Sequence, residues 1–169
     1  MAWRSGSKAS KPADRDKEPG VVQGDESKAA FVERFKSAWR EGAQGLIDFE
    51  GVVAADVLLT QPLTPAVRGL EAFRAQFKSL FDVMPDLRGE VLSWGASSDG
   101  VLIDLELRGT LSGRKVKLNS CDRIVLRDGL MSERHARFDP LPLVGAVALS
   151  PSAALALMRA RRAGARRGR

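Results

Sequence analysis

The sequence predicts an α+β domain in which three N-terminal helical segments pack on one face of a curved antiparallel sheet. The N-terminal half contains amphipathic helical patterns, clearest at 30–39 and 70–84. Residues 87–138 instead contain runs of alternating apolar and polar residues separated by short turns. Because the helices precede the strands and do not alternate with them, we expect the inner face of one sheet to enclose an apolar pocket.

The helical segments are predicted from the spacing of their apolar residues. The first carries Phe31, Phe35, Ala38 and Trp39 on one face. A shorter segment is expected at 43–53, before a short strand at 57–60. The third, at 70–84, ends where Pro85 stops it.

The final hairpin determines which charged residues share a face. We expect Arg127, Asp128 and Gly129 to form a three-residue loop, with glycine in the left-handed position. In that register Asp122 lies directly opposite Arg134 on an otherwise apolar face. A two-residue Asp128-Gly129 loop would oppose two arginines and mix apolar with charged positions on both faces, so the three-residue loop is favoured.

The same register predicts the rest of the three-stranded sheet. On the outer face it opposes Arg123 to Glu133, Cys121 to His135 and Lys117 to Asp139, which suits contact with water. The preceding strand, 101–108, alternates regularly, and Ser112-Gly113 is a plausible two-residue turn. The expected inner-face partners of that strand are Ile103 with Asp122, Leu105 with Ser120, and Leu107 with Leu118.

Charge distinguishes the ends of the chain from its centre. The chain has 169 residues, enough for one domain with a substantial core. Residues 1–27 balance five basic against five acidic residues without an apolar period, so we expect a disordered polar tail. The domain is expected at 28–143 and a helical segment at 144–158. The Arg-rich tail at 159–169 carries six arginines and no acid, and therefore accounts for the whole formal charge of +6.

Composition argues against several classes of function. A single cysteine, Cys121, excludes an internal disulfide, and a single histidine, His135, argues against an imidazole metal site. No glycine-rich phosphate loop or Cys/His cluster occurs, so we expect no cofactor and no metal. Without a signal peptide pattern, cytoplasm is the expected location. The Arg-rich tail lacks interleaved aromatic residues, so we expect no specific nucleic-acid binding and at most weak contact with an acidic surface or membrane.

The chain resembles the nuclear transport factor 2-like superfamily, specifically its SnoaL-like polyketide cyclase and ketosteroid isomerase relatives. The resemblance lies in AADVLLTQP at 54–62 followed by RGLEAF at 68–73, MPDL at 84–87, and DGLMSER at 128–134 with Phe138-Asp139. It implies a cone-shaped sheet around a pocket for a small apolar molecule, and a homodimer. The superfamily includes isomerases, cyclases, epoxide hydrolases and noncatalytic binders, so the resemblance specifies the fold better than the activity.

The family's catalytic positions match only in part. The ketosteroid isomerase general base falls on Gln61, its oxyanion-hole aspartate on Asp122, and its helix tyrosine near Ser37, in a chain without tyrosine. The limonene epoxide hydrolase positions fall on Leu105, Leu107 and Ala136. Asp122 is thus the one carboxylate retained from either scheme.

Two interpretations of the Asp122–Arg134 pair follow. In the first, Arg134 keeps Asp122 ionised, Asp122 acts as a general base or positions water, and Arg134 stabilises negative charge on a carbonyl-bearing substrate. The chain would then be an isomerase, cyclase or epoxide hydrolase for a polyketide-, steroid- or terpenoid-like molecule. The expected ligand-binding residues are Gln61, Ser120, Trp39, Phe73, Phe77, Ile103, Leu105 and Phe138.

In the second interpretation the pair is structural, and the domain is a noncatalytic ligand binder or an interaction module. The outer sheet face, with Arg123, Glu133, His135 and Arg137, would then be the homodimer interface. The register places His135 on this face, away from the pocket.

Overall fold

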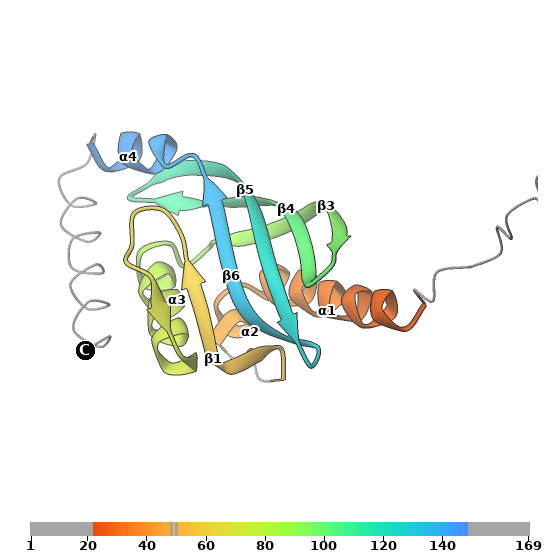
Figure 1. Ribbon diagram of the computed structural model, residues 1–169. Helices are drawn as coiled ribbons and strands as arrows, with labels where there is room; N and C mark the ends of the chain where they lie inside the picture. The colour runs from red at the N-terminus through yellow and green to blue at the C-terminus, as the bar shows by residue number, and fades with distance from the viewer. Residues whose placement is uncertain (1–21, 48, 50, 149–169) are drawn as a thin grey trace, which may run out of the picture.

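The computed structural model describes residues 22–47, 49 and 51–148. It contains one six-stranded sheet with three helices on its concave side and a fourth at one end (Figure 1). The helices are α1 (Val22–Glu41), α2 (Ala43–Ile47), α3 (Leu70–Val83) and α4 (Leu141–Ala148). The strands are β1 (Val53–Thr60), β2 (Val67–Arg68), β3 (Arg88–Ser97), β4 (Gly100–Leu111), β5 (Arg114–Arg127) and β6 (Leu130–Phe138).

The strand order across the sheet is β2-β1-β6-β5-β4-β3. All neighbours are antiparallel except β1 and β6, which are parallel. The predicted α+β class and curved sheet are therefore confirmed, whereas the expectation of a purely antiparallel sheet is wrong. Strand β2, helix α3 and strands β3 to β5 lie between β1 and β6 along the chain, and so long a connection allows the two strands to run in the same direction.

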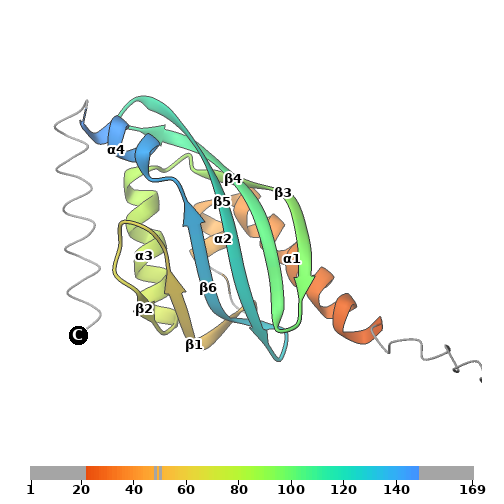
Figure 2. The same cartoon turned by 45° about the horizontal axis from the view of Figure 1, so that its top comes forward.

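Helices α1 and α3 pack on the sheet through the apolar faces that the sequence predicts. Phe31, Phe35 and Trp39 of α1 are buried, as are Phe73 and Phe77 of α3. Figures 1 and 2 show α1 beneath the β3–β4 side of the sheet and α3 beneath the β1 side. The core therefore fills the space between these two helices and the concave face.

Element boundaries differ from the expected ones at three places. Helix α1 begins at Val22, so 22–27 are helical, while 1–21 of the expected disordered tail lie outside the described residues. Helix α2 ends at Ile47, and β1 already begins at Val53, where a helix was expected. Helix α4 crosses the expected boundary between 143 and 144. Residues 149–169, including the Arg-rich tail, lie outside the described residues.

The β4–β5 hairpin confirms its predicted register. Ile103 pairs with Asp122, Leu105 with Ser120 and Leu107 with Leu118. The turn is Ser112-Gly113, with φ values of 49° and 80°. Both angles are in the left-handed region that a two-residue type I′ turn requires.

The β5–β6 hairpin has a different register from the predicted one. Arg127 pairs with Leu130, so the loop has two residues, Asp128 (φ 55°) and Gly129 (φ 74°), and the three-residue loop is wrong. Beyond the turn, Leu126 pairs with Met131 but Val125 pairs with Glu133, which leaves Ser132 as a bulge. One extra residue on β6 reverses the facing of every later position.

This bulge restores the two faces that a regular two-residue hairpin would have mixed. Asp122 lies opposite Ala136, and Arg134 lies opposite Ile124. The two charged residues therefore share the inner face as predicted, but as diagonal neighbours. The expected outer pairs Arg123–Glu133, Cys121–His135 and Lys117–Asp139 are not formed.

Candidate functional site

Asp122 is the central residue of the inner face. It lies between the apolar side chains of two neighbouring strands, Ile103 on β4 and Ala136 on β6, and its side chain is fully buried. Alternation along β5 places Ser120 on the same face, two residues before it. A carboxylate so placed needs hydrogen-bond partners, since an unpaired buried charge is strongly unfavourable.

Both carboxylate oxygens of Asp122 have partners. The Ser120 hydroxyl donates to Oδ1 at 2.5 Å, and Arg134 Nε donates to Oδ2 at 2.7 Å. Arg134 Nη2 also ion-pairs with Oδ2. Within the described residues the arginine therefore contacts Oδ2, and Oδ1 accepts its hydrogen bond from Ser120.

Arg134 lies among aromatic rings from two helices. Its Cζ is 5.3 Å from the ring centroid of Trp39, 5.7 Å from that of Phe35 and 5.6 Å from that of Phe77. Such contacts stabilise a desolvated guanidinium through the ring quadrupole. The helices thus hold the arginine from one side, while Asp122 holds it from the sheet.

One hydrogen-bond donor in this cluster has no partner. Trp39 Nε1 is buried and makes no hydrogen bond within the described part of the chain. Because buried donors in folded proteins nearly always have partners, the cluster lacks an acceptor atom that a ligand or an ordered water would supply.

The structure brings most of the predicted ligand-binding residues to this cluster. Trp39 and Phe77 contact Arg134 directly, and Phe73 packs on Phe77 with ring centroids 4.6 Å apart. Residues Ile103 and Leu105 are fully buried beside Asp122 and Ser120. Phe35 is the contact that the sequence interpretation missed, although its helical spacing from Trp39 was an available signal.

The remaining two predicted ligand-binding residues lie at the edges of the cluster. Phe138 is half-buried and pairs with Ser120. Gln61 is half-buried and directly follows β1, in which Leu59 pairs with Arg134. Its amide makes no hydrogen bond within the described residues, so it is available to a ligand.

The positions that match the isomerase tyrosine and the epoxide hydrolase catalytic residues do not carry catalytic side chains in this chain. Ser37 is exposed on the outer side of α1, where its hydroxyl donates to Glu41 Oε1 at 2.9 Å. Leu105, Leu107 and Ala136 are buried apolar side chains. Trp39 is instead the residue of α1 that presents a polar atom to the interior.

His135 lies on the outer face, as predicted. Its Nδ1 is 2.8 Å from Thr60 Oγ1 and its Nε2 is 2.8 Å from Glu133 Oε2. It pairs across the sheet with Arg123, whereas Cys121 pairs with Arg137. His135 is therefore separated from the Asp122–Arg134 cluster by the sheet itself.

Neither a metal site nor a membrane span was found in the described residues. They contain no group of three or more His, Cys, Asp or Glu side chains able to hold a metal ion. No helix within the same ranges is long and apolar enough to cross a membrane.

The fold is that of an NTF2-like domain. The family model for the SnoaL-like domain matches residues 28–134, and this chain belongs to that family. No match was found among curated proteins.

Solved structures support the same fold. A candidate SnoaL-like polyketide cyclase from Jannaschia sp. CCS1 is 22% identical, with a TM-score of 0.66 over 82% of this chain and 100% of its own. TsrD from Streptomyces laurentii is 20% identical, with a TM-score of 0.60 over 72% of this chain and 95% of its own. An LEH-like epoxide hydrolase from M. tuberculosis is 14% identical, with a TM-score of 0.59 over 77% of this chain and 96% of its own.

Proposed function

We propose that the domain binds a small apolar molecule that carries a carbonyl or epoxide oxygen, and that Asp122 and Arg134 act on it. The observation that supports this proposal is the unpaired indole N–H of Trp39, which lies beside Arg134 in a buried aromatic cluster. A ligand oxygen would accept a hydrogen bond from this N–H, and the aromatic and aliphatic side chains around it would contact an apolar skeleton. The similarity to a candidate polyketide cyclase and an epoxide hydrolase is consistent with such a ligand.

The proposed chemistry needs no cofactor. Negative charge that develops on the substrate oxygen would be stabilised by Arg134, which Asp122 holds in place, and by the indole N–H of Trp39. Asp122 Oδ1 accepts one hydrogen bond from Ser120 and keeps lone-pair capacity, so it is the oxygen able to take a proton or orient water. Isomerisation, aldol-type cyclisation and epoxide opening can each use a donor to the substrate oxygen together with a base or water-orienting group.

Binding is tested with ligand pairs that differ only in the oxygen. A polycyclic ketone and its deoxygenated hydrocarbon are titrated against the full chain, with tryptophan fluorescence as the signal. We expect the ketone to bind at least about tenfold more tightly, equivalent to about 1.4 kcal/mol, since a site with an unpaired donor rejects the analogue that lacks the acceptor. Equal affinities for the two ligands would rule out the donor role.

Catalysis is tested separately, by screening polyketide-like and terpenoid ketones and epoxides for turnover. With a substrate in hand, Asp122→Asn should lower kcat by about 10²-fold or more if Asp122 transfers a proton. Ser120→Ala serves as the matched control, because it removes one hydrogen bond and leaves the carboxylate. Unchanged turnover in the Asp122 variant would rule out proton transfer by Asp122, and a screen without any turnover would leave a noncatalytic binding domain.

Our second proposal is a homodimer formed through the outer sheet face. It rests on the exposure of the apolar side chain of Leu102. This residue lies on the outer face of β4, opposite Arg123, and its side chain is 46% exposed. The exposed Cys121 belongs to the same face. Mass measurement during size-exclusion chromatography should give a dimer, and Leu102→Asp should convert it to monomer. A native monomer at high concentration would exclude this interface.

A further inference from the structure

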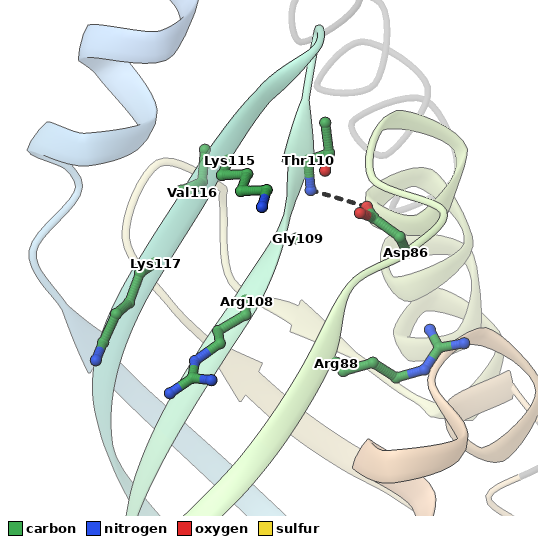
Figure 3. Close-up of a pocket in the computed structure, with 8 residues that line it drawn as sticks. All are labelled: Asp86, Arg88, Arg108, Gly109, Thr110, Lys115, Val116 and Lys117. Carbon is green, nitrogen blue, oxygen red and sulfur yellow. Dashed lines mark hydrogen bonds between the residues drawn. The ribbon is translucent and has the colours of Figure 1, made fainter.

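A groove on the outer side of the sheet lies apart from the Asp122–Arg134 cluster. It has a volume of about 410 Å³ and lies near the β4–β5 turn (Figure 3). Its lining residues are Asp86, Arg88, Arg108, Gly109, Thr110, Lys115, Val116 and Lys117. The long side chains on β4 and β5 alternate with Leu107 and Leu118, which face the core, so this groove belongs to the opposite face.

Three cations of this groove occupy one row across three strands. Arg88 on β3 pairs with Arg108 on β4, and Arg108 pairs with Lys117 on β5. Like charges at directly opposed positions repel one another. A sheet that places three cations in register therefore attracts negative charge to this row.

Glu106 provides part of that negative charge. Its side chain is 7% exposed, and its two oxygens ion-pair with Arg108 and Lys117. Hydrogen bonding to Lys117, more than that to Arg108, holds the pKa of Glu106 below its ordinary value, although burial acts in the opposite direction. One carboxylate thus serves two cations.

Lys115 is the cation of the β4–β5 part of the groove that has no carboxylate partner among the described residues. It pairs across the sheet with Thr110, and its ammonium makes no ion pair within the described residues. Figure 3 shows its side chain above the groove, beside Thr110. The nearby Asp86 is engaged, because its Oδ1 accepts a hydrogen bond from the Thr110 backbone N–H at 2.8 Å.

The charges around the groove do not balance. Three cations, Arg108, Lys115 and Lys117, face two carboxylates, Asp86 and Glu106, which leaves an excess of one positive charge. The Arg88 guanidinium points away from them, and its Nη1 donates to the Leu87 carbonyl at 2.8 Å (Figure 3). A phosphate monoester carries about −1.5 to −2 at pH 7 and offers three acceptor oxygens. Ligand sites commonly measure about 300–1,000 Å³, so the groove has room for a phosphate and for part of an organic group.

We propose that this groove binds the phosphate group of a small soluble molecule, with Lys115 as its principal ligand. The outer edges of Arg108 and Lys117 provide further donors. This site is independent of the proposed function on the inner face, since the sheet separates the two.

The test uses inorganic phosphate and pyrophosphate as probes on the full chain. In ¹H–¹⁵N spectra at constant ionic strength, saturable shifts are expected for the amides of Thr110, Lys115 and Lys117. Lys115→Gln should weaken the affinity by about fivefold or more, the size expected for one charge-assisted hydrogen bond at a partly exposed site. This variant leaves the Glu106 ion pairs intact, so folding is expected to be preserved and is checked from the same spectra.

The matched control is Arg137→Gln, which removes one positive charge from an exposed position on β6. An equal loss of affinity in both variants would overturn the proposal, because it would indicate attraction by net charge alone. Citrate shifts as large as those of phosphate would overturn the assignment to phosphate. Lys115-dependent sedimentation with phosphatidylglycerol vesicles, without any response to soluble phosphate, would overturn the assignment to a soluble ligand.

Discussion

Arg134 reaches Asp122 along the diagonal of the β5–β6 ladder. Arg134 lies opposite Ile124 and Asp122 lies opposite Ala136, yet Arg134 Nε and Asp122 Oδ2 are 2.7 Å apart. The diagonal geometry brings the guanidinium among the rings of α1 and α3. The bulge at Ser132 is therefore a structural requirement of the proposed site, since it turns Arg134 inward.

The first prediction concerns the stability of this pair. Asp122→Asn and Arg134→Met should each lower the free energy of unfolding by about 3–5 kcal/mol, because each leaves an uncompensated buried group. The double variant should lose less than the sum of the two single losses. Urea unfolding of all four proteins gives the coupling energy. A coupling below about 0.5 kcal/mol would show that the pair is not energetically linked.

The second prediction concerns Gly89, which packs against the indole of Trp39. A Cβ at this position would lie 2.8 Å from Trp39 Cε3 and 2.9 Å from Cδ2. Gly89→Ala should therefore displace the ring, lower stability by about 1–3 kcal/mol and change the tryptophan fluorescence.

Gly95 in the same strand is the matched control. A Cβ there would meet nothing within 4 Å, so Gly95→Ala should leave both stability and fluorescence nearly unchanged. Equal losses of stability in the two variants would mean that the loss arises from the backbone of β3. The contact with Gly89 would then not hold the Trp39 ring in place.

The helices and the division of the sheet into two faces could be predicted from the sequence. Phe31, Phe35 and Trp39 repeat with the helical period, and Ser112-Gly113 has the residue types of a tight turn, so local information is sufficient. The bulge at Ser132 has no such signal, because the extra residue is recognised only when both strands are in place. The prediction placed Asp122 and Arg134 on one face for the wrong reason: it assigned the extra residue to the loop.

Long-range pairing accounts for the rest of what was missed. The parallel alignment of β1 with β6 joins Leu59 to Arg134, which are far apart in the sequence. The outer groove likewise depends on the registers of three strands, which align Arg88, Arg108 and Lys117. Alternation along one strand shows that each cation faces outward, but it cannot show that the three are neighbours.

The third prediction concerns the β5–β6 turn. Gly129 has a φ of 74°, and a Cβ would meet no atom closer than 3.6 Å, so backbone strain alone opposes a side chain there. Gly129→Ala should lower stability by about 1–2 kcal/mol. Asp128→Asn should have an effect within about 0.5 kcal/mol, because asparagine suits the first position of a type I′ turn. Thermal unfolding measures both, and similar losses in the two variants would contradict this turn geometry.

The fourth prediction concerns the pH dependence due to Glu106. Lys117 and Arg108 lower its pKa in the folded protein, so its stabilising contribution is present above its unfolded value near 4.5 and is lost as the pH falls through the folded value. Glu106→Gln should therefore be less stable than the wild type at neutral pH, and the difference should shrink as the solution is acidified below about pH 4.5.

Urea unfolding from pH 7 to pH 3 measures this effect. Glu90→Gln is the matched control, since Glu90 is an exposed carboxylate directly across the β3–β4 ladder from Glu106. The control should show a much smaller dependence, because no ion pair joins Glu90 to a described residue. A constant difference between Glu106→Gln and wild type at every pH would show that the loss comes from packing, and that Glu106 does not compensate the cation row through its charge.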